Sequence, residues 1–75
     1  MIKKSMSGYL MIMINNNEFL WEKGLTVEKL LRKNNFLIHL SIVKINGRLI
    51  NKKSFATQII NDSDDIKIVH LVAGG

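Results

Sequence analysis

The segment SIVKINGRLI, residues 41–50, constrains the fold more than any other part of this chain. Two runs rich in β-branched and other large aliphatic residues lie on either side of Asn46-Gly47. This dipeptide favours a tight turn between antiparallel strands, because both residue types tolerate left-handed backbone angles. The segment therefore predicts a β-hairpin, which any fold of the chain must contain.

A second hairpin is predicted near the start of the sequence. Residues 9–15 form an apolar run of strand length. Met11 or Met13 would be equally good first residues of this strand. Residues 15–17 are three asparagines, which favour a turn, and residues 18–22 supply the returning strand.

A short amphipathic helix is predicted after this hairpin. Thr26 is a suitable N-cap residue, since its hydroxyl can accept a hydrogen bond from the first helical turn. Val27, Leu30 and Leu31 share one helical face, and Asn34 ends the pattern. A helix this short is unstable alone, so it must pack on the sheet.

The segment that follows the central hairpin is mostly connection. Phe55, Ile59 and Ile60 are its expected apolar anchors, and residues 62–65 favour a turn. A last strand is then expected at residues 66–71.

The alternation of side chains along this last strand predicts its two faces. Ile66 and Ile68 are expected on one face, and Lys67 and Val69 on the other.

These elements predict an α+β domain in which one helix packs across one face of a mixed sheet of four or five strands. The connection through the helix should join parallel strands with a right-handed crossover. The other sheet face is left open, with Val69 and Leu71 expected on it. We assign residues 11–71 to the domain, residues 1–10 to a loose N-terminal extension and residues 72–75 to a flexible C-terminal tail.

The composition argues against several classes of function. The 75 residues include no cysteine, so we expect no disulfide, thiolate metal site or cysteine nucleophile, and a cytoplasmic location fits. The apolar runs are too short to span a membrane. The net charge of +5 leaves a small basic nucleic-acid-binding module as an alternative, but no aromatic residues lie between the basic ones as stacking platforms.

No catalytic residue and no metal ligand is predicted. The spacing of His39 and His70 matches neither a catalytic triad nor a zinc site, and His70 is expected to pack locally in the last strand. Asp62, Asp64 and Asp65 lack the loop length, the glycine and the closing glutamate of a calcium site. We interpret these carboxylates as a solvated turn.

The last residues, Val72, Ala73, Gly74 and Gly75, suggest chemistry at the chain terminus. Glycine has no Cβ, so the active site of another protein can close around such a tail. The reactive group would be the Gly75 carboxylate, which adenylation converts into a mixed anhydride open to attack by a sulfur or oxygen nucleophile. The alternative is a terminus without function.

Several features together resemble the ubiquitin-like β-grasp sulfur carriers of the ThiS/MoaD-like family. They are the element order, the Asn46-Gly47 hairpin, the sequence DSDDIKIVHLVAGG and the terminal Gly-Gly. The resemblance covers residues 11–75 and is strongest to the carriers of thiamine biosynthesis. This chain departs from the pattern at Ser63, where the family usually has glycine, and serine is less suited than glycine to positive φ.

The resemblance implies a protein co-substrate without a bound cofactor, and not an enzyme. An E1-like adenylyltransferase would use ATP to adenylate Gly75. A persulfide supplied by a cysteine desulfurase would convert the adenylate into a thiocarboxylate, which would give its sulfur to thiazole synthase. Gly74, Ala73 and Val72 would thread into the partner.

The resemblance also implies a docking surface and one close alternative. Val69 and Leu71 are the expected docking residues, and the scattered lysines would steer encounters with acidic partner surfaces. The alternative is the small subunit of molybdopterin synthase, whose members usually approach the tail through a proline-rich segment. This chain contains no proline, which favours the thiamine branch.

Overall fold

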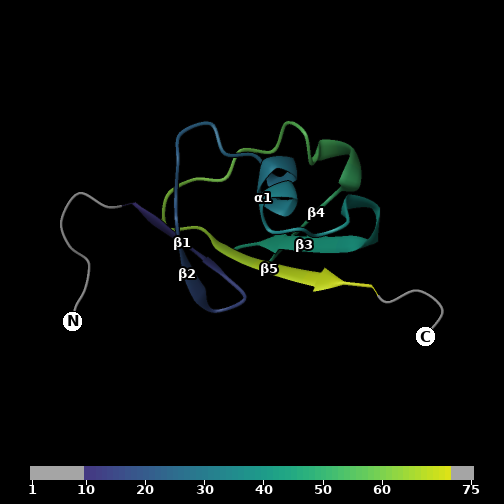
Figure 1. Cartoon of the computed structure of the whole chain (residues 1–75), viewed down its shortest axis with the longest axis horizontal. Coiled ribbons are helices and arrows are strands. Elements are labelled where there is room, and N and C mark those ends of the chain that lie inside the picture. The colour runs from purple at the N-terminus through teal and green to yellow at the C-terminus, as the bar shows by residue number, and fades with distance from the viewer. Residues whose placement is uncertain (1–9, 72–75) are drawn as a thin grey trace.

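Within residues 10–71, five strands form one mixed sheet, and a single α-helix packs on one of its faces (Figure 1). The computed structural model describes residues 10–71. The elements, in chain order, are β1 (Met11–Ile14), β2 (Asn17–Leu20), α1 (Val27–Lys33), η1 (Ile38–Leu40), β3 (Ser41–Ile45), β4 (Arg48–Ile50), η2 (Lys52–Ser54) and β5 (Asp65–His70). The predicted α+β class and element order are confirmed.

The strand order in the sheet is β2-β1-β5-β3-β4, which places β5 at the centre. Strand β5 pairs parallel with β1 and antiparallel with β3, while β2 and β4 form the two edges. The strands that α1 connects, β2 and β3, run in the same direction, as predicted. They are not neighbours, however, because β1 and β5 lie between them.

Both hairpins turn through two residues with positive φ, as a type I′ turn requires. The φ angles are 50° and 71° at Asn15 and Asn16, and 52° and 83° at Asn46 and Gly47. The two predicted turns are therefore confirmed, except that Asn17, which was predicted in the first turn, is the first residue of β2.

The strands of the first hairpin are shorter than predicted. Strand β1 ends at Ile14 because Asn15 already belongs to the turn, and residue 9 lies outside the described residues. Strand β2 ends at Leu20, after which the indole N–H of Trp21 donates a hydrogen bond of 2.6 Å to the carbonyl of Ile60. That contact joins the end of the first hairpin to the segment that precedes β5.

Helix α1 begins and ends where the sequence predicts. The hydroxyl of Thr26 accepts a hydrogen bond of 3.2 Å from the main-chain N–H of Lys29, and Asn34 is the C-cap residue. Val27, Leu30 and Leu31 are buried against the sheet. The helix thus contributes one apolar face to a core shared with the strands.

The core lies between α1 and the sheet. Its buried apolar residues are Ile12, Ile14, Leu25, Val27, Leu30, Leu31, Val43, Ile45, Ile50, Phe55, Ile60, Ile66 and Ile68. Phe55 and Ile60 are anchors, as predicted, but the prediction for Ile59 is wrong, since 45% of it is exposed. Ile59 forms an isolated bridge with Thr26, and in such extended backbone successive side chains point in opposite directions.

Strand β5 begins and ends one residue earlier than predicted. Asp65 pairs with Met13 of β1 and therefore belongs to the strand, while Leu71 follows its last residue. Ile66 and Ile68 are buried, whereas Val69 is exposed. The predicted alternation along this strand is confirmed.

Candidate functional site

The sheet face opposite α1 carries an apolar patch near the end of β5. The register places Val69 directly beside Ile42 of β3, and both point away from the core. Val69 is 56% exposed and Leu71, two residues further along, is 43% exposed. Leu49 of β4 is also on this face and is 63% exposed. We call Ile42, Leu49, Val69 and Leu71 the open-face patch.

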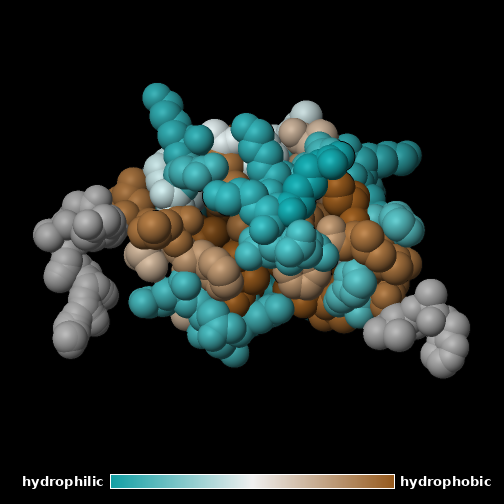
Figure 2. Space-filling view, viewed as in Figure 1, coloured by the Kyte–Doolittle hydropathy of each residue, from teal (hydrophilic) through white to brown (hydrophobic). Residues whose placement is uncertain are grey.

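A shallow groove lies beside the open-face patch. It has a volume of about 340 Å³ and lies between β3 and β4, where Ile42, Leu49 and the stem of Lys52 line it. Figure 2 shows apolar surface at the end of the molecule where β5 ends, with hydrophilic side chains around it. The patch therefore offers a partner both exposed apolar area and a concave feature.

Basic side chains lie next to the open-face patch on the same sheet face. Lys44 of β3 is directly opposite Lys67 of β5 and is exposed. The Lys67 ammonium donates a hydrogen bond of 2.6 Å to Asn16 and lies 3.9 Å from the Asp65 carboxylate. Such exposed contacts add little stability. The combination of apolar centre and basic side chains suits a partner surface with acidic residues at its rim.

His70 and Ser41 face each other in the sheet register but do not form a reactive pair. The imidazole of His70 packs edge-on against Phe36, with ring centroids 5.9 Å apart. The hydroxyl of Ser41 is buried and donates a hydrogen bond of 2.7 Å to the carbonyl of Leu37. The predicted local packing of His70 is confirmed.

In the acidic turn before β5, Asp62 and Asp65 are exposed but Asp64 is buried. Asp64 is only 9% exposed, and its carboxylate accepts hydrogen bonds from the Asn46 amide at 2.9 Å and the Asn61 N–H at 2.8 Å. Asp62 accepts a hydrogen bond of 2.9 Å from the main-chain N–H of Met11. The interpretation of this turn as solvated is therefore wrong for Asp64, because Asn46 and the connection cover it. Across residues 10–71, no three His, Asp or Glu side chains are grouped as metal ligands.

Ser63 has a φ of 71°, so it occupies the left-handed conformation for which the resembling family usually has glycine. Its main-chain N–H donates a hydrogen bond of 2.7 Å to the carbonyl of Met11. The turn before β5 is thus formed in spite of the serine.

The predicted site residues fall into two groups. Val69 and Leu71 lie exposed at the end of the central strand, while residues 72–75 lie outside the described residues. Sequence reasoning missed Ile42, the neighbour of Val69, and Leu49, which lies on the same face one strand further away. The alternation along residues 41–50 could have placed both on the open face, but only the sheet order shows that β5 lies next to β3.

None of the helices within residues 10–71 is long and apolar enough to cross a membrane.

One comparison with known proteins identifies a family. The model of the ThiS family matches residues 8–75 of this chain. No curated protein matches the chain in sequence.

Two solved structures resemble the fold. One is the crystal structure of a thiamine biosynthesis protein (ThiS) from Geobacter metallireducens, with a TM-score of 0.71 and 20% sequence identity over 88% of this chain and 100% of that chain. The other is the NMR solution structure of a thiamine biosynthesis protein from the same organism, with a TM-score of 0.70 and 19% identity over 88% of each chain. The likeness extends the fold description to a ubiquitin-like β-grasp.

Proposed function

Since this chain belongs to the ThiS family, we propose that it is the sulfur carrier of a thiamine biosynthesis pathway and that Gly75 carries the sulfur. The observation that carries the proposal is the extent of the family match, which runs through the terminal Gly74-Gly75. The resemblance of the fold to two thiamine biosynthesis proteins supports the same assignment.

The proposed chemistry takes place at the main-chain carboxylate and needs no side chain of this protein. An E1-like adenylyltransferase joins the Gly75 carboxylate to the α-phosphate of ATP, and pyrophosphate leaves. The terminal sulfur of a protein persulfide, loaded by a cysteine desulfurase, then attacks the acyl carbon and AMP leaves. A thiol attacks the remaining sulfur–sulfur bond, which yields a thiocarboxylate on Gly75 and a disulfide on the donor side. A reducing compartment such as the cytoplasm would supply that thiol.

The described residues contribute docking and presentation in this proposal. The open-face patch binds the partner enzymes, with Val69 and Leu71 closest to the tail in sequence. Residues 72–75 then thread into the partner active site, where Gly74 allows close approach of the surrounding protein. Thiazole synthase is the proposed acceptor of the sulfur.

The polar groups of the domain support a carrier and not a self-contained catalyst. The His70 ring is packed on Phe36, and the Asp64 carboxylate is held by Asn46 and Asn61. The Asp64 carboxylate is thus engaged in the fold and the His70 ring has a local packing partner, and we assign the catalytic groups to the partner enzymes.

Intact mass spectrometry tests the proposed function. The full chain is incubated with ATP, an E1-like adenylyltransferase, a persulfide donor and a thiol. We expect its mass to rise by the difference between one sulfur and one oxygen atom, and a chain lacking Gly75 to show no change. Sulfur gained by the truncated chain, or no gain by the full chain with any activating enzyme, would contradict the proposal. Complementation of a thiamine auxotroph distinguishes the thiamine branch from the molybdopterin branch.

A further inference from the structure

Strand β5 extends well beyond the end of its parallel neighbour β1. The main-chain pairing of the two strands stops at Ile14 and Ile66, whereas β5 continues to His70. The last main-chain hydrogen bond between them runs from the N–H of Asn15 to the carbonyl of Ile66, at 2.9 Å. Among residues 10–71, no strand therefore lies beside the second half of β5 on the β1 side.

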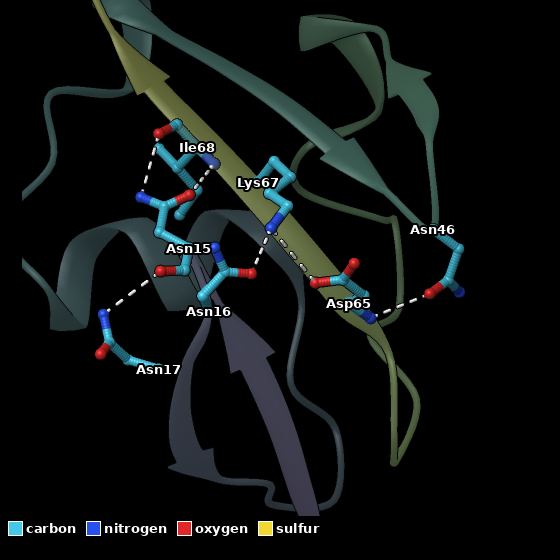
Figure 3. A network of polar contacts seen from close by, with 7 residues as sticks. All are labelled: Asn15, Asn16, Asn17, Asn46, Asp65, Lys67 and Ile68. Carbon is cyan, nitrogen blue, oxygen red and sulfur yellow. Dashed lines mark hydrogen bonds and ion pairs between the residues drawn. The ribbon is translucent and has the colours of Figure 1, made fainter.

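The side chain of Asn15 occupies the next position of this ladder. Its Oδ1 accepts a hydrogen bond of 2.8 Å from the N–H of Ile68, and its Nδ2 donates one of 3.1 Å to the carbonyl of the same residue (Figure 3). A primary amide has the same donor and acceptor as a peptide group. The Asn15 amide thus takes the place of a strand residue that β1 does not provide.

The alternation of hydrogen bonds along β5 shows which side of the strand the Asn15 contact holds. The carbonyls of Asp64 and Ile66 accept from β1 and its turn, whereas Leu71 donates to Leu40, on the β3 side. Even-numbered residues thus bond towards β1 and odd-numbered ones towards β3. Within residues 10–71, Ile68 is the last residue of β5 with a recorded hydrogen bond on the β1 side, and Asn15 provides it.

The neighbouring residue Asn16 provides a natural comparison. It has the same left-handed backbone as Asn15, with φ of 71° against 50°. Its side chain does not bond to the backbone of β5 but accepts a hydrogen bond of 2.6 Å from the ammonium of Lys67. Of the two adjacent asparagines, only Asn15 holds the main chain of the strand that leads to the tail.

We propose that Asn15 is a positioning residue for the carrier: β3 holds the second half of β5 on one side, and the Asn15 amide holds it on the β1 side, so that the strand is fixed up to the residues that precede the tail. The consequence for sulfur loading rests on the proposed function. An enzyme that threads the tail must order the strand leading to it, and a strand already held in place lowers that cost. Loss of the Asn15 contact should therefore weaken productive binding of the carrier without slowing the chemistry at Gly75.

The test compares the full-length variants Asn15→Gly and Asn16→Gly. Glycine accepts positive φ at both positions, so the two substitutions affect the turn backbone alike and differ in the contact with Ile68. Loss of two net hydrogen bonds predicts that the Ile68 amide exchanges hydrogen about tenfold faster in Asn15→Gly than in Asn16→Gly, while core amides of α1 are equal in both. With the E1-like adenylyltransferase, the KM for the carrier should rise about three- to tenfold in Asn15→Gly alone, with kcat unchanged.

Three results would overturn the positioning role. One is equal exchange at Ile68 in both variants, and another is an equal KM. The third is faster exchange at all core amides of Asn15→Gly with an unchanged KM, since that pattern describes a residue that only stabilises the domain. If Asn15→Gly fails to fold, Asn15→Asp replaces it, because it keeps the acceptor for the Ile68 N–H and removes only the donor. Because the Ile68 N–H keeps its acceptor in that variant, the measurement is then the KM alone, and a KM of Asn15→Asp equal to that of Asn16→Gly would overturn the proposal.

The experiment separates this inference from the proposed function. If no activating enzyme modifies the wild-type chain, the proposed function fails. The exchange rate of the Ile68 amide still tests whether Asn15 holds β5. Equal rates in Asn15→Gly and Asn16→Gly would show that it does not.

Discussion

The two hairpin turns can be compared directly, because each places an asparagine with a left-handed backbone beside the central strand β5. In the first turn, Oδ1 of Asn15 accepts the N–H of Ile68 at 2.8 Å. In the second, Oδ1 of Asn46 accepts the N–H of Asp65 at 2.9 Å. Figure 3 shows the two side chains reaching β5 from different turns and at different points along it. The same residue type in the same turn conformation thus holds one strand at two points, its first residue Asp65 and Ile68.

The difference lies in what the amide nitrogen of each asparagine contacts. The nitrogen of Asn15 donates to the main-chain carbonyl of Ile68, whereas that of Asn46 donates to the carboxylate of Asp64, which is only 9% exposed. A buried carboxylate that loses a donor costs more than a main-chain carbonyl that can turn to water. We infer that Asn46 chiefly stabilises the fold, while Asn15 chiefly orders one segment of β5.

The largest effect expected from this comparison is that of Asn46→Asp. The substitution keeps the shape and the acceptor for Asp65 but replaces the donor to Asp64 with a second negative charge. We expect a loss of about 2–3 kcal/mol in the free energy of unfolding, since a buried charge loses a partner and gains a repulsive neighbour. Urea unfolding at neutral pH, followed by Trp21 fluorescence, measures it.

The matched control is Asn15→Asp, which makes the same chemical change in the other turn. It removes one hydrogen bond to a main-chain carbonyl, so the expected loss is about 1 kcal/mol. Equal losses in the two variants would show that burial of Asp64 does not distinguish the turns, and the comparison would fail.

A smaller effect is expected at the second position of the central turn. Gly47 has a φ of 83°, and a Cβ built on it meets no atom within 4 Å. The cost of Gly47→Ala is therefore backbone strain alone, about 1 kcal/mol, with no clash to relieve. Thermal or urea unfolding measures it, and a loss several times larger would reveal a contact that the geometry lacks.

Much of the fold could be predicted because its signals are local. Asn46-Gly47, the threonine N-cap and the alternation in the last strand each depend on neighbours in sequence, and each is confirmed. The prediction for Ile59 failed because its orientation depends on a bridge to Thr26, far away in the chain. The solvated interpretation of Asp64 failed for the same reason, since Asn46 covers it from another element.

The candidate site was less accessible to sequence reasoning. Exposure of Val69 follows from alternation, but its contact with Ile42 depends on sheet order, which places β5 between β1 and β3. The role of Asn15 could not be predicted either. The sequence indicates a turn at three asparagines, but not which of the amides reaches a strand more than fifty residues later.

The smallest expected effect concerns another left-handed position, which lies next to the same buried Asp64. Ser63 has a φ of 71°, where a side chain costs energy and glycine does not. Ser63→Gly relieves that strain but also adds freedom to the unfolded chain, so we expect a net gain of about 0.5 kcal/mol. The control is Ser54→Gly in η2, where φ is not positive and glycine should lose a similar amount. A loss of stability at both serines would mean that the turn before β5 tolerates serine without strain, and that glycine in this turn is not required by backbone geometry.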